Sequence, residues 1–222
     1  MQTMCSIDSQ NNSRLTLGCS FYKMFWVFFL FSILGTVIEG AYWIIRYGHF
    51  QMRSGLIYGP FSEVYGMAAV LIIFLLFRFR NKSILFIFIA GYIIGVSFEF
   101  IASVLQQWIF GFNSWDYGNA KYAIGGRANL IFGFFWGLLA VIFIKRLYPK
   151  LSALIEKIPR KIGLTITILV MVFLTFDCIV SSAAVHRYEE RKLHIPPDNY
   201  IEQVMDNHYT DSYLKKVYQQ IH

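Results

Sequence analysis

Four acidic side chains fall inside long apolar runs of the sequence, and their type and position suit them for chemistry. They are Glu39, Glu63, Glu99 and Asp177. Because a carboxylate is costly in hydrocarbon, each acid is expected to face other helices and to have a partner or carry a proton. Such a group can bind a substrate, relay protons or perform acid–base chemistry.

Arginine residues near the same ends of the apolar runs are the expected counter-charges. Arg53 is predicted to lie near Glu39, and Arg127 near Glu99. Two interpretations follow. Either two ion pairs pin the connecting loops onto the helices, or the four acids and their arginines line a polar cavity that binds a substrate. Four acids exceed what two ion pairs require, so the cavity is preferred, with all four acids and both arginines as substrate-binding groups.

The first of these loops joins the first two apolar runs and reads RYGHFQMRSGLIYGPFSEVYG, residues 46–66. It has too many glycines for a helix and too many aromatic residues for a spacer. Pro60 is predicted at the first position of the next helix, where proline is favoured. Glu63 then falls in the first turn, where a helix N-terminus favours negative charge. The segment is interpreted as a folded cap at one membrane face.

A second glycine- and aromatic-rich loop covers residues 111–126 and contains NSWDYGNAKYAIGG. Trp115 and Asp116 lie within it. One interpretation is an aromatic belt at the membrane interface with an aspartate in a turn. The other is a lid over the cavity, in which Asp116 bonds to backbone groups or to an arginine. Both residues are therefore added to the predicted substrate-binding set.

The apolar runs must be membrane-spanning helices. Of the 222 residues, 56% are hydrophobic and 18% aromatic, and several runs exceed the ~18 residues that mark a spanning helix. The predicted fold is an all-α integral membrane protein with about five transmembrane helices, expected at 22–45, 61–77, 84–110, 127–147 and 162–185. A membrane domain, 22–185, then lies between a cytoplasmic segment, 1–21, and a polar extracytoplasmic tail, 186–222.

Basic residues are unevenly divided between the two membrane faces that this arrangement defines. The face that holds the N-terminal segment carries eleven Lys and Arg residues against two acids, whereas the two loops on the other face carry four basic residues. Because positive residues stay cytoplasmic, the N-terminus is predicted inside the cell, with both loops and the tail outside the plasma membrane. The net charge of +7 is therefore a topology signal and not a sign of nucleic-acid binding.

The first and third apolar runs share a short pattern. Gly35-Thr-Val-Ile-Glu39 in the first matches Gly95-Val-Ser-Phe-Glu99 in the third, and the helices that follow contain Tyr65-Gly66 and Trp136-Gly137. Residues four apart share a helix face, so each glycine allows a neighbouring helix to approach beside the glutamate. The pattern indicates a parallel repeat of two helices, spans one and two matching spans three and four; a chance match is the alternative.

Other kinds of site find no support in the sequence. The three cysteines, Cys5, Cys19 and Cys178, are scattered without the spacing of a zinc site, so no metal is expected. No serine, cysteine or histidine nucleophile accompanies the acids, so no enzyme class is indicated. The phosphate-binding pattern of a nucleotide-hydrolysing loop is missing from the sequence, and no cofactor is expected.

Several of these motifs together resemble a family of small bacterial membrane proteins called putative ABC-transporter type IV, or CmpB-like permeases. The motifs are Arg53-Ser-Gly-Leu-Ile-Tyr-Gly-Pro60 with Tyr65-Gly66, the paired Gly-x-x-x-Glu helices, Trp115-Asp116-Tyr117, Gly126-Arg127 and Trp136-Gly137. The resemblance spans about residues 22–150 and implies a transporter permease. Since the chain has no ATP-hydrolysing motif, such a role implies a separate ATPase subunit as partner.

The function expected from the sequence is therefore that of a multi-pass membrane protein, a permease-like transport component with an acid and arginine site that faces outward. Its partners are the lipid bilayer, a separate ATPase subunit and a small-molecule or lipid substrate of unknown identity. Two alternatives stay open. One is a membrane-embedded enzyme that acts on a lipid or envelope precursor at the outer leaflet, and the other is a non-catalytic membrane subunit or assembly factor.

Overall fold

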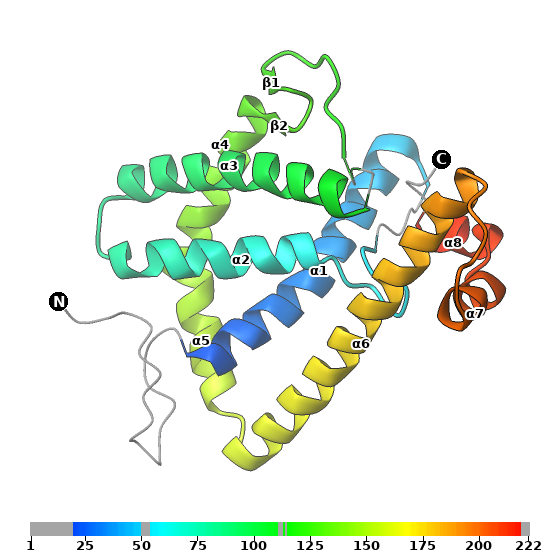
Figure 1. Ribbon diagram of the computed structural model, residues 1–222. Coiled ribbons are helices and arrows are strands. Elements are labelled where there is room, and N and C mark those ends of the chain that lie inside the picture. Colours follow the sequence, from blue (N-terminus) through cyan, green and yellow to red (C-terminus); the bar gives the residue numbers. More distant parts are fainter. Residues whose placement is uncertain (1–19, 50–53, 111–112, 114, 219–222) are drawn as a thin grey trace.

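The computed structural model describes residues 20–49, 54–110, 113 and 115–218 of the chain, and helices make up nearly all of it (Figure 1). The predicted N-terminal segment, except for its last two residues, and Arg53 lie outside the described residues. The helices are α1 Phe21–Tyr47, α2 Glu63–Leu76, α3 Ile84–Phe110, α4 Leu130–Ile142, α5 Tyr148–Glu156, α6 Arg160–Lys192, α7 Tyr200–His208 and α8 Asp211–Val217. A short 3₁₀ turn, Phe77–Phe79, follows α2, and two short strands, β1 Ala123–Ile124 and β2 Ala128–Asn129, pair antiparallel before α4.

Four helical stretches among the described residues are long and apolar enough to cross a membrane. They are α1, α3, the continuous stretch Leu130–Glu156 and α6. The predicted all-α membrane architecture is thus confirmed. The predicted second span corresponds to α2, whose 14 residues extend about 21 Å and fall short of the ~30 Å of a hydrocarbon core.

The start of α2 differs from the sequence expectation. Ser62 is the N-cap, with an extended backbone at φ −117° and ψ 100°, and Glu63 is the first helical residue. Pro60 therefore lies before the helix and not at its first position. The cause is local: Gly59 has φ +117°, and the backbone stays irregular through the next three residues. The expectation that Glu63 lies in the first turn is confirmed.

Helical structure continues without interruption past the predicted end of the fourth span. A π-helical segment, Phe143–Leu147, joins α4 to α5 without a break in helical structure. Lys23, in the first turn of α1, is fully buried and forms an ion pair with Glu156 at the end of α5. This ion pair ties the beginning of α1 to the end of the α4–α5 stretch.

The same close helix contact occurs in both halves of the predicted repeat. A Cβ atom added to Gly35 of α1 would overlap the ring of Tyr65 in α2, and one added to Gly95 of α3 would overlap the ring of Trp136 in α4. Small residues allow such close approach between membrane helices. Each glycine that precedes a glutamate thus receives an aromatic ring from the helix that follows it.

A second matched contact involves the glycine that directly follows the aromatic residue in the second helix of each pair. A Cβ at Gly66 of α2 would overlap Phe28 of α1, and a Cβ at Gly137 of α4 would come within 2.8 Å of the Phe88 carbonyl oxygen of α3. In each first helix the phenylalanine lies seven residues before the glycine of the Gly-x-x-x-Glu pattern. Two independent contacts therefore relate α1–α2 to α3–α4, which supports the interpretation as a repeat.

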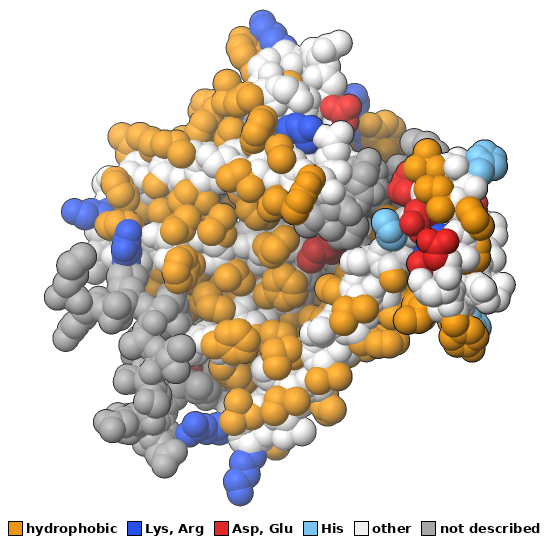
Figure 2. All heavy atoms as spheres, viewed as in Figure 1, with side chains coloured by type: hydrophobic (Ala, Val, Ile, Leu, Met, Phe, Trp, Pro, Cys, Tyr) orange, Lys and Arg blue, Asp and Glu red, His pale blue; other side chains and the backbone are white. Residues whose placement is uncertain are grey.

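The main buried cluster contains side chains from α1, α2, α3, α4 and α5, while many other apolar side chains of these helices are exposed. Its members include Val27, Ile73, Ile87, Ile144 and Tyr148. Hydrophobic side chains cover much of the face of α2, α3 and α6 that Figure 2 shows. That exposure is expected of helices whose outer surface contacts lipid, since lipid tails are as apolar as the side chains.

The polar tail is a helical hairpin docked on the end of α6. Arg187, only 2% exposed, forms ion pairs with Glu190 at 2.6 Å, Glu202 at 3.5 Å and Asp206 at 2.7 Å. The predicted start of the tail at residue 186 falls inside α6, which continues to Lys192. The carboxylates of α7 neutralise the buried guanidinium, and this allows the basic end of α6 to stay helical and packed.

Candidate functional site

The loop between α3 and α4 is a folded structure held against α3. The Tyr117 hydroxyl donates a hydrogen bond to Glu99 Oε1 at 3.1 Å. The backbone N–H of Tyr117 donates to the Gly126 carbonyl oxygen at 2.8 Å, and the Trp115 indole N–H donates to the Arg127 carbonyl oxygen at 2.9 Å. This geometry gives the predicted lid a defined shape, with one hydroxyl that reaches the acid of α3.

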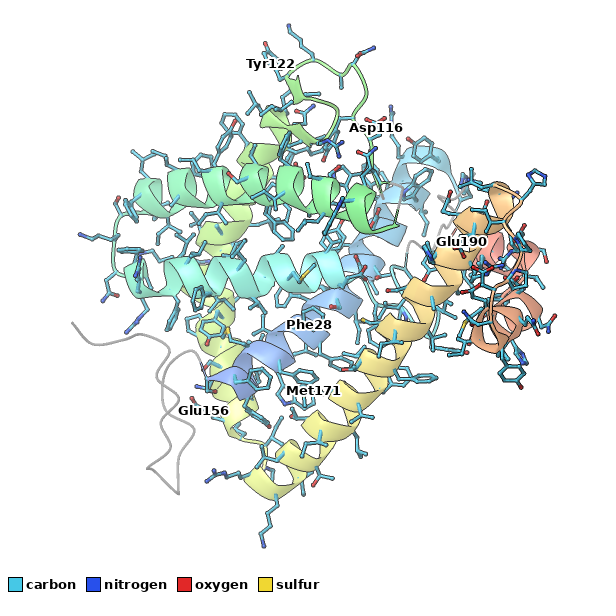
Figure 3. The ribbon with its side chains drawn as sticks, in the orientation of Figure 1. Phe28, Asp116, Tyr122, Glu156, Met171 and Glu190 are labelled. Carbon is cyan, nitrogen blue, oxygen red and sulfur yellow. The ribbon has the colours of Figure 1, made fainter. Side chains whose placement is uncertain are left out.

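Asp116 shapes the turn of this loop and lies at its surface. Its Oδ1 accepts a hydrogen bond from the Gly118 N–H at 2.7 Å, so the carboxylate bonds to backbone. A Cβ atom added to Gly126 would lie 2.7 Å from the same oxygen, so a side chain there would be crowded. The backbone of Gly126 also has a φ of +72°, a conformation that glycine adopts more readily than other residues. Figure 3 shows Asp116 on the strand of the loop that leads away from α3. The loop encloses a shallow cavity of about 490 Å³, lined by Asp116, Gly118, Asn119, Ala120, Ala123, Gly125 and Gly126.

Glu99 has one carboxylate oxygen engaged and one left open. Oε1 accepts the Tyr117 hydrogen bond, whereas Oε2 is buried and accepts no hydrogen bond of ordinary geometry in the described part of the chain, although the Trp136 side chain and the Asn129 backbone lie near the carboxylate. Burial raises the pKa of the Tyr117 hydroxyl above its usual value, and the charges of Glu99 and of the more distant Glu39 raise it further. The phenol therefore stays protonated and donates to the acid. Carboxylates from α1 and α3 both act on one hydroxyl of the loop.

Arg127 contacts α3, but through neutral side chains. Its Nη1 donates to Ser103 Oγ at 3.2 Å, and its Nη2 donates to Gln107 Oε1. These residues follow Glu99 at intervals of four along one helix face. The ion pairs formed among the described residues do not include Arg127 with Glu99. The guanidinium instead fixes the end of the loop further along α3.

Glu39 lies half-buried on α1, one turn beyond Gly35. Its predicted partner, Arg53, falls in residues 50–53, outside the described part of the chain. The pairing of Glu39 with Arg53 therefore stays a prediction. Arg46, the other arginine of this loop, is exposed and lies over the ring of Tyr47, 5.9 Å from its centre.

The remaining two predicted acids lie together beneath a different element, the irregular segment of residues 54–62. Asp177 of α6 is completely buried. Its Oδ1 accepts hydrogen bonds from the Tyr58 N–H at 3.1 Å and from the Ser181 hydroxyl at 3.0 Å. The carboxylate of Glu63 lies directly on Gly55, where a Cβ would overlap it. Both acids thus hold the segment that connects α1 to α2.

Ser54 organises this segment, and the sequence analysis did not identify it. Its buried Oγ lies 2.8 Å from the Leu56 carbonyl oxygen, 2.7 Å from that of Gly59 and 3.0 Å from that of Phe61. It also accepts a hydrogen bond from the Leu56 N–H at 3.2 Å. Serine next to a glycine-rich turn was the available signal, because a serine hydroxyl bonds readily to nearby backbone.

Tyr218 is a second contact that the sequence did not indicate. It lies just after α8, is 2% exposed, and donates a hydrogen bond from its hydroxyl to the Gly55 carbonyl oxygen at 3.2 Å. Its partner is more than 160 positions away in the chain, so no local pattern could predict the contact. The tail therefore packs against segment 54–62 as well as α6.

The predicted site residues thus separate into two described groups. Trp115, Asp116 and Arg127 belong to the loop between α3 and α4, which contacts Glu99, whereas Glu63 and Asp177 lie beneath segment 54–62. Glu39 lies on α1. The described residues contain no cluster of three or more His, Cys, Asp or Glu side chains.

Comparison with known proteins gives one match. The model of a family described as "Putative ABC-transporter type IV" matches residues 26–182. No curated protein and no solved structure matches the chain. The matched stretch runs from α1 into α6 and contains all the acids and arginines predicted for the site, while α7 and α8 lie beyond it.

Proposed function

The chain belongs to the putative ABC-transporter type IV family, and on that premise we propose that it is a permease-like transport component whose substrate binds at Glu99, under the loop between α3 and α4. Family membership and four helices of spanning length make it a membrane-embedded, transporter-like protein.

The open oxygen of Glu99 is the observation that carries the proposal. A buried carboxylate oxygen without a hydrogen-bond donor is unfavourable, by roughly 1–3 kcal/mol or more for a charged group. A substrate that supplies a donor or a positive charge would remove that cost. In the proposal, Glu39 adds a second carboxylate, Arg53 and Arg127 act as counter-charges, and Trp115 and Asp116 belong to the lid.

The proposed orientation places the lid outside the cell. The uneven distribution of Lys and Arg supports a cytoplasmic N-terminus and an extracytoplasmic tail in the plasma membrane. The sequence contains no phosphate-binding loop of the nucleotide-hydrolysing type. We therefore assign ATP hydrolysis to a separate subunit that would dock on the cytoplasmic side.

Glu99→Gln tests the proposal, because it keeps the shape of the side chain and removes the charge. Cells that lack the chain are complemented with the wild type or the variant, and small-molecule pools inside the cells and in the medium are compared by mass spectrometry. We expect the wild type to shift at least one pool and Glu99→Gln to lose the shift at equal membrane abundance.

Glu189→Gln, a change of the same kind on the tail side of α6, is the matched control and should keep the shift. Two results would contradict transport. One is turnover of a lipid or envelope precursor by the purified chain alone, which would favour an enzyme. The other is a loss that follows only from lower abundance of a partner subunit, which would favour an assembly role.

A further inference from the structure

Two buried carboxylates lie beneath segment 54–62, and no ion pair among the described residues includes either of them. Oδ2 of Asp177 and Oε2 of Glu63 are both buried and have no hydrogen-bond partner in the described part of the chain. The lysines and arginines that form ion pairs among the described residues do so elsewhere, at the end of α5 and in the tail. Two such charges require a balancing positive charge.

Asp177 is hydrogen-bonded on one carboxylate oxygen, and Glu63 lies at a helix N-terminus. Asp177 accepts two hydrogen bonds on Oδ1, from a backbone N–H and from the Ser181 hydroxyl. Glu63 is the first residue of α2, where the helix dipole and the unpaired N–H groups favour a negative charge. Hydrogen-bond donors therefore stabilise Asp177 on Oδ1, whereas its Oδ2 and the Oε2 of Glu63 have no hydrogen-bond partner in the described part of the chain.

Neutral oxygen atoms lie around the same place. The Tyr218 hydroxyl bonds to the carbonyl oxygen of Gly55, the residue on which the Glu63 carboxylate rests. Ser181 supplies a hydroxyl oxygen beside Asp177 and also accepts a hydrogen bond from the Ile57 N–H at 2.9 Å. Carboxylates together with carbonyl and hydroxyl oxygens are the ligands that hard cations prefer.

We propose that Glu63 and Asp177 bind one small monovalent metal cation, of the sodium class, beneath segment 54–62. Carbonyl oxygens of non-helical backbone coordinate sodium ions in membrane transporters, and segment 54–62 is such backbone. Zinc would need histidine or cysteine ligands, and calcium takes six to eight oxygens, usually from more carboxylates than these two.

The burial of the site restricts the ligand to an ion and excludes a larger organic cation. Asp177 has no exposed surface, and segment 54–62 and Tyr218 cover the pair. Bound in this position, the cation would connect α2, α6 and the segment between α1 and α2. Its use as a coupling ion rests on the proposed transport function, whereas its binding does not.

The test measures thermal unfolding of the purified full-length protein in detergent, in sodium chloride and in choline chloride of equal ionic strength and pH. We expect sodium to raise the melting temperature of the wild type in a saturable manner. Glu63→Gln and Asp177→Asn should each weaken the apparent sodium affinity by about tenfold or more, an energy of about 1.4 kcal/mol. Asp198→Asn, an exposed acid of the tail, should respond like the wild type.

Three outcomes would overturn the proposal. They are equal stabilisation by both salts, an unchanged sodium response in Asp177→Asn, and stabilisation in choline chloride on acidification without a sodium effect, which would show that the pair holds a proton. If the variants do not fold, equilibrium binding of radiolabelled sodium to the wild type decides, and lack of saturable binding refutes the site. Saturable sodium binding without any change in small-molecule pools would refute transport alone.

Discussion

At the scale of single residues, Ser54 illustrates how one hydroxyl can determine the path of a connecting segment. Three carbonyl oxygens and one N–H approach its Oγ. A hydroxyl has one proton and two lone pairs, so it donates to one carbonyl at a time and accepts from the N–H. The segment that covers Glu63 and Asp177 therefore depends on a residue that belongs to neither the acids nor the glycines.

Ser54→Ala is predicted to destabilise the protein by about 1–3 kcal/mol, because buried backbone groups lose their partner. The measurement is the melting temperature in detergent, which should fall by several degrees. Ser97→Ala, on an exposed position of α3, is the control and should melt like the wild type. Equal melting temperatures for both variants would show that Ser54 does not organise the segment.

Much of the residue-scale chemistry could be anticipated, but the partners could not. Hydropathy alone identified the acids, because charged residues stand out in apolar runs. It did not reveal that Arg127 would bond Ser103 and Gln107 while Tyr117 takes Glu99. Which donor reaches a given acid depends on the path of a loop, and that path is set by tertiary contacts.

At the scale of elements, the two helix pairs repeat one packing contact. Gly95→Ala and Gly35→Ala are each predicted to destabilise the protein by about 1–3 kcal/mol, because the added methyl group meets an aromatic ring of the next helix. Thermal unfolding measures the effect. Ile93→Ala, at a 57% exposed position of α3, should cost less. A strong effect at one glycine and none at the other would argue against equivalent helix pairs.

The docking of α7 and α8 is predicted to weaken in acid. Hydrogen bonds from Arg187 and then Arg191 lower the pKa of Asp206 below its usual value. A carboxylate with a lowered folded pKa adds stability above its unfolded pKa of about 3.9, and that stability is lost as the pH falls through the folded value. Pepsin cleavage between residues 193 and 218 should therefore increase as the pH drops below about 4.

Asp206→Asn supplies the matched comparison for this acid effect. The variant should be cleaved readily even at the upper end of the acid range, with little further change as the pH falls. Asp198→Asn should behave like the wild type, since that carboxylate is exposed at the tail surface. A wild-type tail that resists pepsin equally at every acid pH would contradict the prediction.

At the scale of the whole molecule, the side of the membrane on which each loop lies is the decisive prediction. In a variant without native cysteines, a membrane-impermeant maleimide should label Asn119→Cys and Ser212→Cys in intact cells. Asn81→Cys, in the turn after α2, should be labelled only after permeabilisation, because the basic turn is predicted to be cytoplasmic. The reverse pattern would move the proposed site to the cytoplasmic side.

The number and order of the membrane helices could be predicted in outline, because the length of each apolar run and the basic residues that flank it can be read directly from the sequence. The helix ranges from the sequence agree closely with α1 and α3, whereas the helical stretch that begins with α4 continues to Glu156 and α6 continues to Lys192, both beyond the predicted ends. The docking of the tail on segment 54–62 was not predictable. It joins Tyr218 to Gly55, and such distant contacts leave no period in the sequence.

The π-helical segment between α4 and α5 has a consequence for the end of the molecule that holds the start of α1. A π turn accommodates an additional residue in an otherwise α-helical stretch. Deleting one residue from Phe143–Leu147 would restore plain α-helix and rotate everything after it by about 100°. Ser152 and Ile155, which are buried, would then turn toward lipid or water. Glu156 would move away from Lys23, and the ion pair between them would be lost. The extra residue thus acts as an angular spacer that keeps both ends of the bundle in phase.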